Sequence, residues 1–455
     1  MASIALVEPG AAGFHVYSAF RLPRLGLPSL AAVLRRMGHR VTIYCEAIRR
    51  FDPRELLSAD LVGISTTTST APRAYALADL CQAHGVPVVT GGVHASFLPD
   101  EALAHSDYCV TGEGEEVFPA LVDRLLARVS PAGVPGVHGH GLPVVAADTP
   151  PCRITDLDSL PFPDLEAIQG WHDGAITPIM TSRGCPYNCT FCAVTALFGR
   201  KYRFRNMESV VEELQWRRPR SVFFYDDHFV ANRARTRALL ETMLSRGVTP
   251  PWMAQVRADV ARDPELLRLM RRSGCDRVFI GFESISPETL SSYGKQQTLE
   301  DITACVRVLH EHRIKVHGMF VLGSDEDDLA TAPATARFAL KQGIDTVQFL
   351  LLTPLPGTPL YAQLDGQRRI FERDWALYDG HHVVYEPLRM TARALQREAW
   401  RAQKRFYSVW ECVKSLARFR VSEGFLHTYA RYIIARWESQ NRGFVRRLIS
   451  REKGE

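Results

Sequence analysis

The sequence predicts an α/β protein with two strand-and-helix regions in series, followed by a helical C-terminal region. Two observations support this class. Short β-rich apolar runs alternate with helical patterns from the N-terminus to about residue 130, and the same alternation resumes at residue 176. Such alternation favours parallel sheets with helices packed on their faces. With 455 residues, the chain is long enough for two or three domains.

The first region, residues 1–130, is expected to form a doubly wound, Rossmann-like sheet. Its strands are short apolar runs, expected at Ile4–Val7, Arg40–Cys45, Asp60–Ser65, Val86–Thr90 and Asp107–Thr111. Helices are expected over Leu27–Met37 and Ala71–His84. Ligands of sheets of this kind bind outside the carboxyl ends of the strands.

Three of these strand ends carry residues suited to ligand binding. The third strand runs into a row of hydroxyls, the fourth into a Gly-Gly turn, and the fifth into a Gly-Glu segment. Paired glycines let a ligand approach the backbone. No G-x-G-x-x-G follows the first strand, which argues against a nicotinamide or flavin site. The candidate binding residues are Ser65, Thr66, Thr67, Gly91, Gly92, His94, Gly112 and Glu113.

Residues 131–175 are rich in Pro, Gly and His and are expected to link the two regions. Six strands alternating with helices then follow, at 176–182, 221–226, 252–257, 277–283, 315–322 and 346–353. Asp263–Pro264 and Ser286–Pro287 mark helix starts, and Thr298 with Asp301 forms a variant of the capping box. Residues 176–365 therefore predict a (β/α)6 partial TIM barrel with its chemistry at the strand C-terminal ends.

Three cysteines stand directly after the first barrel strand. Cys185, Cys189 and Cys192 have the spacing C-x3-C-x2-C. A structural zinc site normally has four N/S ligands, and no fourth Cys or His stands nearby. A 4Fe–4S cluster can take three protein thiolates and leave one iron for an outside ligand. The spacing therefore indicates a 4Fe–4S cluster with one open iron.

This stretch, with Phe191 before the third cysteine, resembles the signature of radical S-adenosylmethionine (SAM) enzymes. In that family SAM chelates the open iron, and an electron from the cluster cleaves SAM to methionine and a 5′-deoxyadenosyl radical. The resemblance implies SAM contacts at successive strand ends. An acidic pair would meet the amino group, an arginine the carboxylate, and a Glu-Ser pair the ribose. The implied SAM-binding residues are Phe191, Asp226, Asp227, Arg257, Glu283 and Ser284.

The first region resembles the cobalamin-binding domain that precedes many radical SAM domains. In that family the hydroxyl-rich and Gly-Gly loops enclose the nucleotide tail of cobalamin, so the eight candidate residues become cobalamin contacts. The D-x-H-x-x-G pattern of methionine synthase-type domains is not found, and His15 lies in the right loop without the Asp or the Gly. The resemblance therefore implies cobalamin without a protein His ligand. A vestigial domain that binds nothing is the alternative.

Residues 366–455 are expected to form a helical domain. From Thr391 onward there are 15 Lys/Arg against 6 Asp/Glu, interspersed with aromatic residues. This excess could serve an acidic substrate or a membrane surface, although most such faces are simply solvated. No apolar run is long enough to span a membrane, and the start lacks a secretory signal pattern. Ten scattered cysteines suit a reducing cytosol. A cytoplasmic protein is expected, with peripheral membrane contact left open and no nucleic acid partner.

Together, these features predict an enzyme that binds a 4Fe–4S cluster, SAM and cobalamin and takes electrons from an external low-potential donor. Class B radical SAM methyltransferases and the anaerobic magnesium-protoporphyrin cyclase are the nearest resemblances. The expected reaction is methylation of an unactivated carbon in a secondary metabolite, lipid or tetrapyrrole. The alternative is a radical cyclase, ring-contracting or carbon–carbon-coupling enzyme with the same cofactors. A cobalamin or redox sensor is disfavoured, because a sensor needs no SAM-binding strand ends.

Overall fold

The computed structural model describes residues 1–11, 13, 22–142, 152–172, 176–417 and 421–453. The chain divides into two compact units. The first comprises Met1–Ala12, Phe20–Tyr187 and Cys192–Asp227, and the second comprises Gly13–Ala19, Asn188–Phe191 and His228–Glu455. The domain boundaries given above stay predictions. His15 lies outside the described residues.

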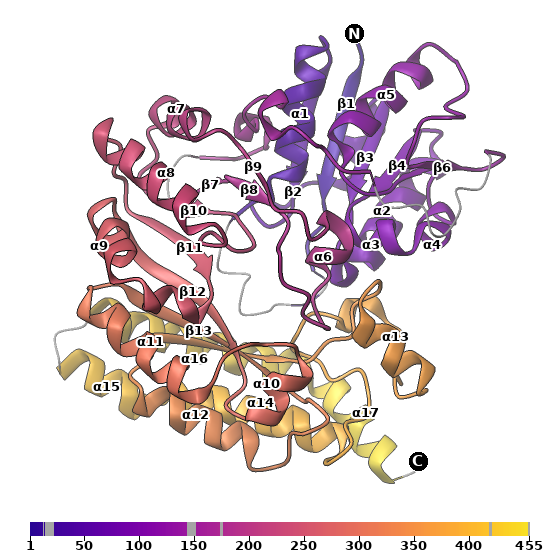
Figure 1. The fold of residues 1–455 in the computed structure, drawn as a ribbon. Helices are drawn as coiled ribbons and strands as arrows, with labels where there is room; N and C mark the ends of the chain where they lie inside the picture. The colour runs from indigo at the N-terminus through magenta and orange to yellow at the C-terminus, as the bar shows by residue number, and fades with distance from the viewer. Residues whose placement is uncertain (12, 14–21, 143–151, 173–175, 418–420, 454–455) are drawn as a thin grey trace. The chain divides into compact units, whose positions relative to one another are not determined.

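The first unit contains a six-stranded sheet in the order β2-β1-β3-β4-β5-β6 (Figure 1). Its strands are β1 (Ser3–Glu8), β2 (Arg40–Cys45), β3 (Leu61–Ser65), β4 (Val88–Gly91), β5 (Tyr108–Val110) and β6 (Val137–Gly139). The first five are parallel, and β6 pairs antiparallel with β5. The predicted doubly wound sheet is therefore confirmed. Strand β6, which lies in the predicted linker, was not foreseen.

Strand β1 shows why this sheet has a core on each face. Ile4 and Leu6 pack with helices α1 (Gly26–Arg36) and α5 (Gly114–Leu126). Ala5 and Val7 pack on the other face with α2 (Ala71–Ala83). Successive side chains of a strand point to opposite faces, and a parallel strand buried on both faces reads as a continuous apolar run. The sheet is thus covered by apolar packing on both of its faces.

Part of the predicted linker packs into the core of the first unit. Leu165 and Ile168 are buried in the same core as Ile43 of β2. Ile168 forms a parallel bridge with Ile43, and the backbone N–H of Gln169 donates to the Ile43 carbonyl at 2.8 Å. The remaining linker residues 143–151 and 173–175 lie outside the described residues.

All six strands predicted for the barrel are present. The first unit contains β7 (Thr177–Ile179), which pairs in parallel with β10 (Val222–Phe224). It also contains a small antiparallel pair, β8 (Ser182–Arg183) with β9 (Arg203–Phe204), and the helices α6 (Val194–Phe198) and α7 (Met207–Arg217).

The second unit contains four consecutive parallel strands, each paired with the next along the chain. They are β11 (Trp252–Val256), β12 (Cys275–Glu283), β13 (Lys315–Leu322) and β14 (Thr346–Leu351). The helices among them are α8 (Arg233–Ser245), α9 (Pro264–Arg272), α10 (Pro287–Ser292), α11 (Leu299–Glu311) and α12 (Thr331–Lys341).

The predicted helix starts of the second unit are also present. Asp263 and Ser286 cap α9 and α10 by accepting from the backbone N–H three residues on. Thr298 and Asp301 form the expected capping box at α11. These local signals fixed where the helices begin.

The C-terminal region is helical, as predicted. Its helices are α13 (Pro359–Gly366), α14 (Ala392–Phe406), α15 (Val409–Ala417), α16 (Val421–Gln440) and α17 (Arg442–Lys453). Tyr407, directly after α14, uses its hydroxyl to donate to the Val347 carbonyl at 2.7 Å and to accept from the Val347 N–H at 2.9 Å. This pair of bonds fixes the end of α14 on β14. Among the described residues, no helix is long and apolar enough to cross a membrane.

Candidate functional site

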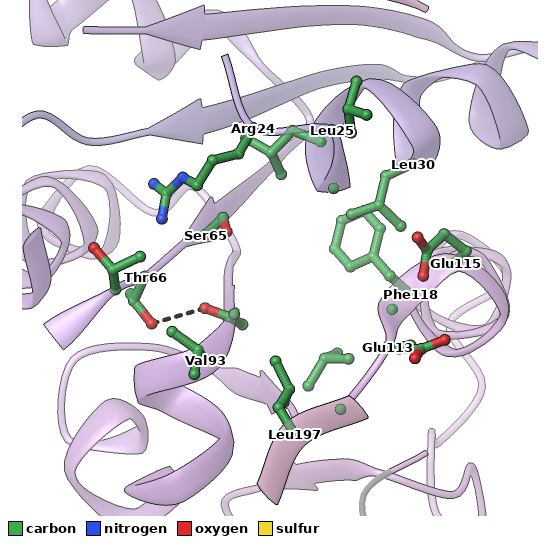
Figure 2. Close-up of a pocket in the computed structure, with 18 of the residues that line it drawn as sticks. Arg24, Leu25, Leu30, Ser65, Thr66, Val93, Glu113, Glu115, Phe118 and Leu197 are labelled. Atoms are coloured by element: carbon green, nitrogen blue, oxygen red, sulfur yellow. Dashed lines mark hydrogen bonds between the residues drawn. The ribbon is translucent and has the colours of Figure 1, made fainter. Parts of the chain in front are cut away.

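A cavity of about 390 Å³ opens at the carboxyl ends of β3, β4 and β5, within the first unit. This volume lies in the range of small-molecule sites. Figure 2 shows apolar side chains, including Leu25 and Phe118, and polar ones, including Ser65, around the same space. Seven of the eight predicted cobalamin residues line it: Ser65, Thr66, Thr67, Gly91, Gly92, Gly112 and Glu113. The three predicted loops therefore converge on one cavity.

The Gly-Gly turn is required by the packing of the chain itself. Gly92 has φ of +91°, and a Cβ there would lie 2.6 Å from the Thr66 carbonyl oxygen. The Thr66 backbone N–H and hydroxyl both donate to the Gly91 carbonyl, each at 2.8 Å. The space that a side chain at Gly92 would fill is thus occupied by the backbone of Thr66. The sequence had suggested that a ligand would lie there.

His94 does not line the cavity. It lies in α3 (Val93–Phe97) with its ring fully buried. Its Nδ1 lies 3.3 Å from the Thr68 hydroxyl, and its Nε2 lies 3.3 Å from a carboxylate oxygen of Glu101. The ring nitrogens thus hold α3 to the hydroxyl-rich loop, and a cofactor contact at His94 stays a prediction that this placement does not favour.

Glu113 lines the cavity, but protein donors occupy its carboxylate. Arg183 Nη1 donates to it at 3.1 Å, Arg203 Nη1 at 2.9 Å, and the Ile154 backbone N–H at 2.9 Å. Arg183 Nη2 also donates to Glu115 at 2.5 Å. All four charged side chains are at most 7% exposed. This buried network joins the loop after β5 to β8 and β9, and Arg183 stands two residues before Cys185.

The two carboxylates of the acidic pair, Asp226 and Asp227, have different surroundings. Asp226 is fully buried and accepts four hydrogen bonds, from the backbone N–H and the hydroxyl of both Thr181 and Ser182, at 2.5–3.2 Å. A carboxylate has about four lone-pair sites, so none remains for a ligand. Asp226 thus holds the corner between β7 and β8, and the SAM contact at Asp226 stays a prediction that these four bonds do not favour.

Asp227, by contrast, lines the cavity. Its surroundings raise the pKa of its carboxyl group to about 7, first through burial and then through the negative charge of Asp226. The Gly184 backbone N–H and the Arg183 charge partly oppose this rise. Asp227 is thus the member of the pair that can meet a ligand.

The strand ends of the second unit carry the other predicted SAM contacts. Glu283 ends β12 with φ of +60°, a conformation that is uncommon for a residue with a side chain and that clusters at functional sites. Lys295 Nζ lies 2.8 Å from Glu283 Oε1, and both side chains are at most 10% exposed. Ser284, also buried, accepts from the Ser286 N–H at 3.1 Å.

Arg257 follows β11, and its charge acts on the buried His228. Burial lowers the pKa of His228 to about 4; Asp259 opposes this shift, and Arg257 and Lys295 add to it. The second unit therefore gathers Arg257, His228, Lys295 and Glu283. His228 and Lys295 were not predicted, because neither carries a local sequence signal that separates it from an ordinary loop residue.

The three cysteines lie in the loop between β8 and α6, are partly exposed, and form no disulfide. Three thiols within eight residues are the donor set that a 4Fe–4S cluster requires, so these residues fit the cluster. Gly184 turns the chain into this loop with φ of +92°, and a Cβ there would lie 2.8 Å from the Lys201 carbonyl. Among the described residues, no three His, Cys, Asp or Glu side chains are already gathered at one metal-binding point.

Phe191, between the second and third cysteines, packs edge-on against Tyr293 at a centroid distance of 5.0 Å. It belongs to an apolar cluster of the second unit that includes Leu360 and Tyr385. A SAM contact at Phe191 stays a prediction.

Comparisons with known proteins agree with this arrangement. The family profile "Radical SAM superfamily" matches residues 179–339, and the profile "B12 binding domain" matches residues 16–122. Bacteriochlorophyllide d C-12(1)-methyltransferase of Chlorobaculum tepidum is 31% identical over 83% of this chain and 81% of its own. Anaerobic magnesium-protoporphyrin IX monomethyl ester cyclase of Cereibacter sphaeroides is 28% identical over 83% and 66%. Hopanoid C-3 methylase of Methylococcus capsulatus is 27% identical over 85% and 77%.

Among solved structures, the radical SAM methyltransferase TsrM from Kitasatospora setae with bound cobalamin and 4Fe–4S cluster shares the fold. Its TM-score is 0.64 at 21% identity, over 89% of this chain and 85% of its own. The comparisons confirm the predicted fold class, the radical SAM enzyme class and the three cofactors, and they favour methyl transfer over cyclisation. The chain belongs to the radical SAM superfamily, in the branch whose members carry an N-terminal B12-binding domain.

Proposed function

We propose that this enzyme transfers a methyl group to an unactivated carbon of a small-molecule or lipid-like substrate of the tetrapyrrole or hopanoid kind. The observation that carries the proposal is the 31% identity to a bacteriochlorophyllide methyltransferase across most of both chains. The hopanoid methylase, at 27% identity, adds a lipid-like substrate of the same reaction type. When bound, SAM with the cluster supplies hydrogen abstraction, and cobalamin carries the methyl group.

The cavity of the first unit would hold the nucleotide tail of cobalamin. Its apolar walls, among them Leu30, Phe118 and Leu197, would exclude water from the tail. The hydroxyls of Ser65 and Thr67 stand at the cavity and would bond the tail's polar atoms.

The thiolates of Cys185, Cys189 and Cys192 would hold the cluster. In the second unit, the Arg257 guanidinium would pair with the SAM carboxylate as a charge-assisted hydrogen bond. Glu283 and Ser284 would receive the ribose, with Lys295 fixing the Glu283 carboxylate at 2.8 Å. Asp227, which lines the cavity of the first unit, would meet the amino group of SAM.

We also propose a cytoplasmic setting with an external low-potential electron donor. The ten cysteines are present as thiols, which suits a reducing compartment. A 4Fe–4S cluster held by only three cysteine thiolates also suits a reducing compartment.

The test is anaerobic turnover of the enzyme reconstituted with iron, sulfide and hydroxocobalamin, supplied with SAM, a reductant and either bacteriochlorophyllide or hopanoid acceptors. Methyl transfer predicts equal amounts of S-adenosylhomocysteine and 5′-deoxyadenosine, and a product heavier by one methylene. The C185A/C189A/C192A triple variant should form no 5′-deoxyadenosine. A product that forms with 5′-deoxyadenosine but without S-adenosylhomocysteine would move the assignment to cyclisation or coupling, the second candidate favoured by the 28% identity to the cyclase.

A further inference from the structure

The helical C-terminal region contains a second cavity, of about 620 Å³, whose described lining residues all belong to α14, α16 and α17. This volume also lies in the range of small-molecule sites. All of its lining residues belong to the second unit, whereas the cavity at the predicted cobalamin loops belongs to the first. The methyl-transfer proposal gives this second cavity no role.

The wall of this cavity is aromatic and apolar. Trp400 of α14 and Trp437 of α16 stack with centroids 4.1 Å apart and planes 25° from parallel. Leu448 and Ile449 of α17 complete the apolar lining. The Trp437 indole nitrogen is buried and finds no acceptor among the described residues. Such a wall suits the hydrocarbon or ring part of a ligand.

The rim of the cavity is strongly positive. Its charged lining residues are Arg393, Arg397, Arg401, Lys404, Arg442 and Arg446, against one carboxylate, Glu438. Four of these cations are already paired. Arg393 lies 2.7 Å from Glu452, Arg397 and Arg401 share Glu398 at 2.9 and 2.8 Å, and Lys404 lies 2.6 Å from Glu438.

Arg442 and Arg446 differ from the other four. Both are exposed, and neither forms an ion pair with a described residue. They are four residues apart on α17 and so lie on the same face of the helix. Arg442 is the first residue of α17, where the helix dipole adds to the positive potential. The ligand complementary to these two arginines and the adjoining apolar wall would therefore carry one anionic group on an apolar body.

We propose that this cavity binds an amphiphilic anion. The apolar part lies against Trp400 and Trp437, and a phosphate or carboxylate head lies between Arg442 and Arg446. Guanidinium groups are suited to such heads because they bind them through two parallel hydrogen bonds. A soluble amphiphile and the head group of an anionic membrane lipid share this chemistry, and the experiment separates the two sources.

The monomeric probe is octyl phosphate, kept below its micelle concentration, with octyl glucoside as the uncharged control. Binding to the full-length protein is measured by isothermal titration and by tryptophan fluorescence, because Trp400 and Trp437 line the cavity. The R442Q/R446Q double variant should weaken octyl phosphate binding at least about tenfold. The control R268Q/R405Q removes the same charge from two exposed arginines that do not line the cavity, and it should bind like the wild type.

Co-sedimentation with phosphatidylglycerol vesicles, against phosphatidylcholine vesicles, identifies the source. Vesicle binding that is lost in R442Q/R446Q but kept in R268Q/R405Q assigns the site to a membrane lipid. Octyl phosphate binding without vesicle binding assigns it to a soluble amphiphile. Wild-type protein that binds neither probe, or two double variants that lose binding equally, would overturn the proposal.

Discussion

Glu113 and Arg183 are joined by a buried hydrogen-bonded ion pair of 3.1 Å, although 70 residues separate them in the chain. Glu113 belongs to the loop after β5 that lines the cavity proposed for cobalamin, and Arg183 lies in β8, two residues before Cys185. Arg203 shares the same carboxylate at 2.9 Å. The loop proposed to hold cobalamin and the strand that leads to the cluster cysteines are therefore parts of one electrostatic unit.

Replacing Glu113 by Gln should destabilise the first unit by about 3 kcal/mol, because two buried guanidinium groups lose their shared negative charge. The measurement is chemical denaturation of the apoprotein. Glu116→Gln is the matched control, since Glu116 is exposed on α5. Equal stability of the two variants would show that the buried network contributes nothing.

Asp226→Asn should cost at least about 2 kcal/mol of stability and reduce cluster loading. An amide offers fewer acceptor sites to the four donors of Thr181 and Ser182, and hydrogen bonds to a charged group contribute about 1.5–3 kcal/mol each. Asp227→Asn should not reduce stability at neutral pH. Iron content after anaerobic reconstitution and thermal denaturation are the readouts. The prediction is wrong if Asp226→Asn loads iron and melts like the wild type.

Gly92→Ala should lower stability by at least about 1–3 kcal/mol and abolish cobalamin retention, because a Cβ there meets the Thr66 carbonyl at 2.6 Å in a conformation open mainly to glycine. Gly366→Ala is the control: its Cβ would have no heavy atom within 4 Å, and Gly366 does not line the cavity. Each protein is incubated with hydroxocobalamin, desalted and scored by absorbance. Retention by Gly92→Ala at the wild-type level would contradict the close packing described above. Wild-type protein that retains no cobalamin would instead indicate a vestigial domain.

Asp227 should make stability depend on pH between about 4 and 7. The pKa of its carboxyl group is raised in the folded protein to about 7, so the folded state binds a proton more tightly than the unfolded state. Stability is therefore greatest below the unfolded pKa and falls as pH rises to about 7, by up to about 1.4 kcal/mol per pH unit. Denaturation of the wild type and of Asp227→Asn across this range gives the comparison. The variant should lack this contribution, and parallel curves would contradict the assignment.

The elements of the fold could be predicted because their signals are local. A short apolar run indicates a strand from neighbouring residues alone. Asp263 before a proline and Thr298 three residues before Asp301 likewise indicate where a helix begins. Strand β6 was not predicted because it has only three residues, in a Pro- and Gly-rich stretch. So short a strand shows no alternation of apolar and polar side chains. The packing of Ile168 beside Ile43 was missed for the same reason.

The sequence allowed the candidate side chains to be placed on neighbouring strand ends, but it did not reveal what each side chain contacts. Strand ends meet at one edge of a parallel sheet, so seven residues from three loops could be grouped from their order alone. Whether a polar side chain faces a ligand or the protein depends on partners far away in sequence. Asp226 is saturated by Thr181 and Ser182, and His94 is held by Thr68, neither of which a spacing rule reveals.

The carboxylate that Glu113 shares between two arginines also determines which crossover points are suitable for chimeras with related enzymes. A chimera that takes residues 1–175 from one enzyme and the remainder from a relative would separate Glu113 from its own Arg183 and Arg203. The carboxylate would then face arginines, or other residues, that belong to the relative. A crossover after Asp227, where the first compact unit ends, transfers Glu113, Arg183 and Arg203 together. Exchanging the cobalamin-binding region between such enzymes then requires moving β7 and β10, two of the six barrel strands, together with it.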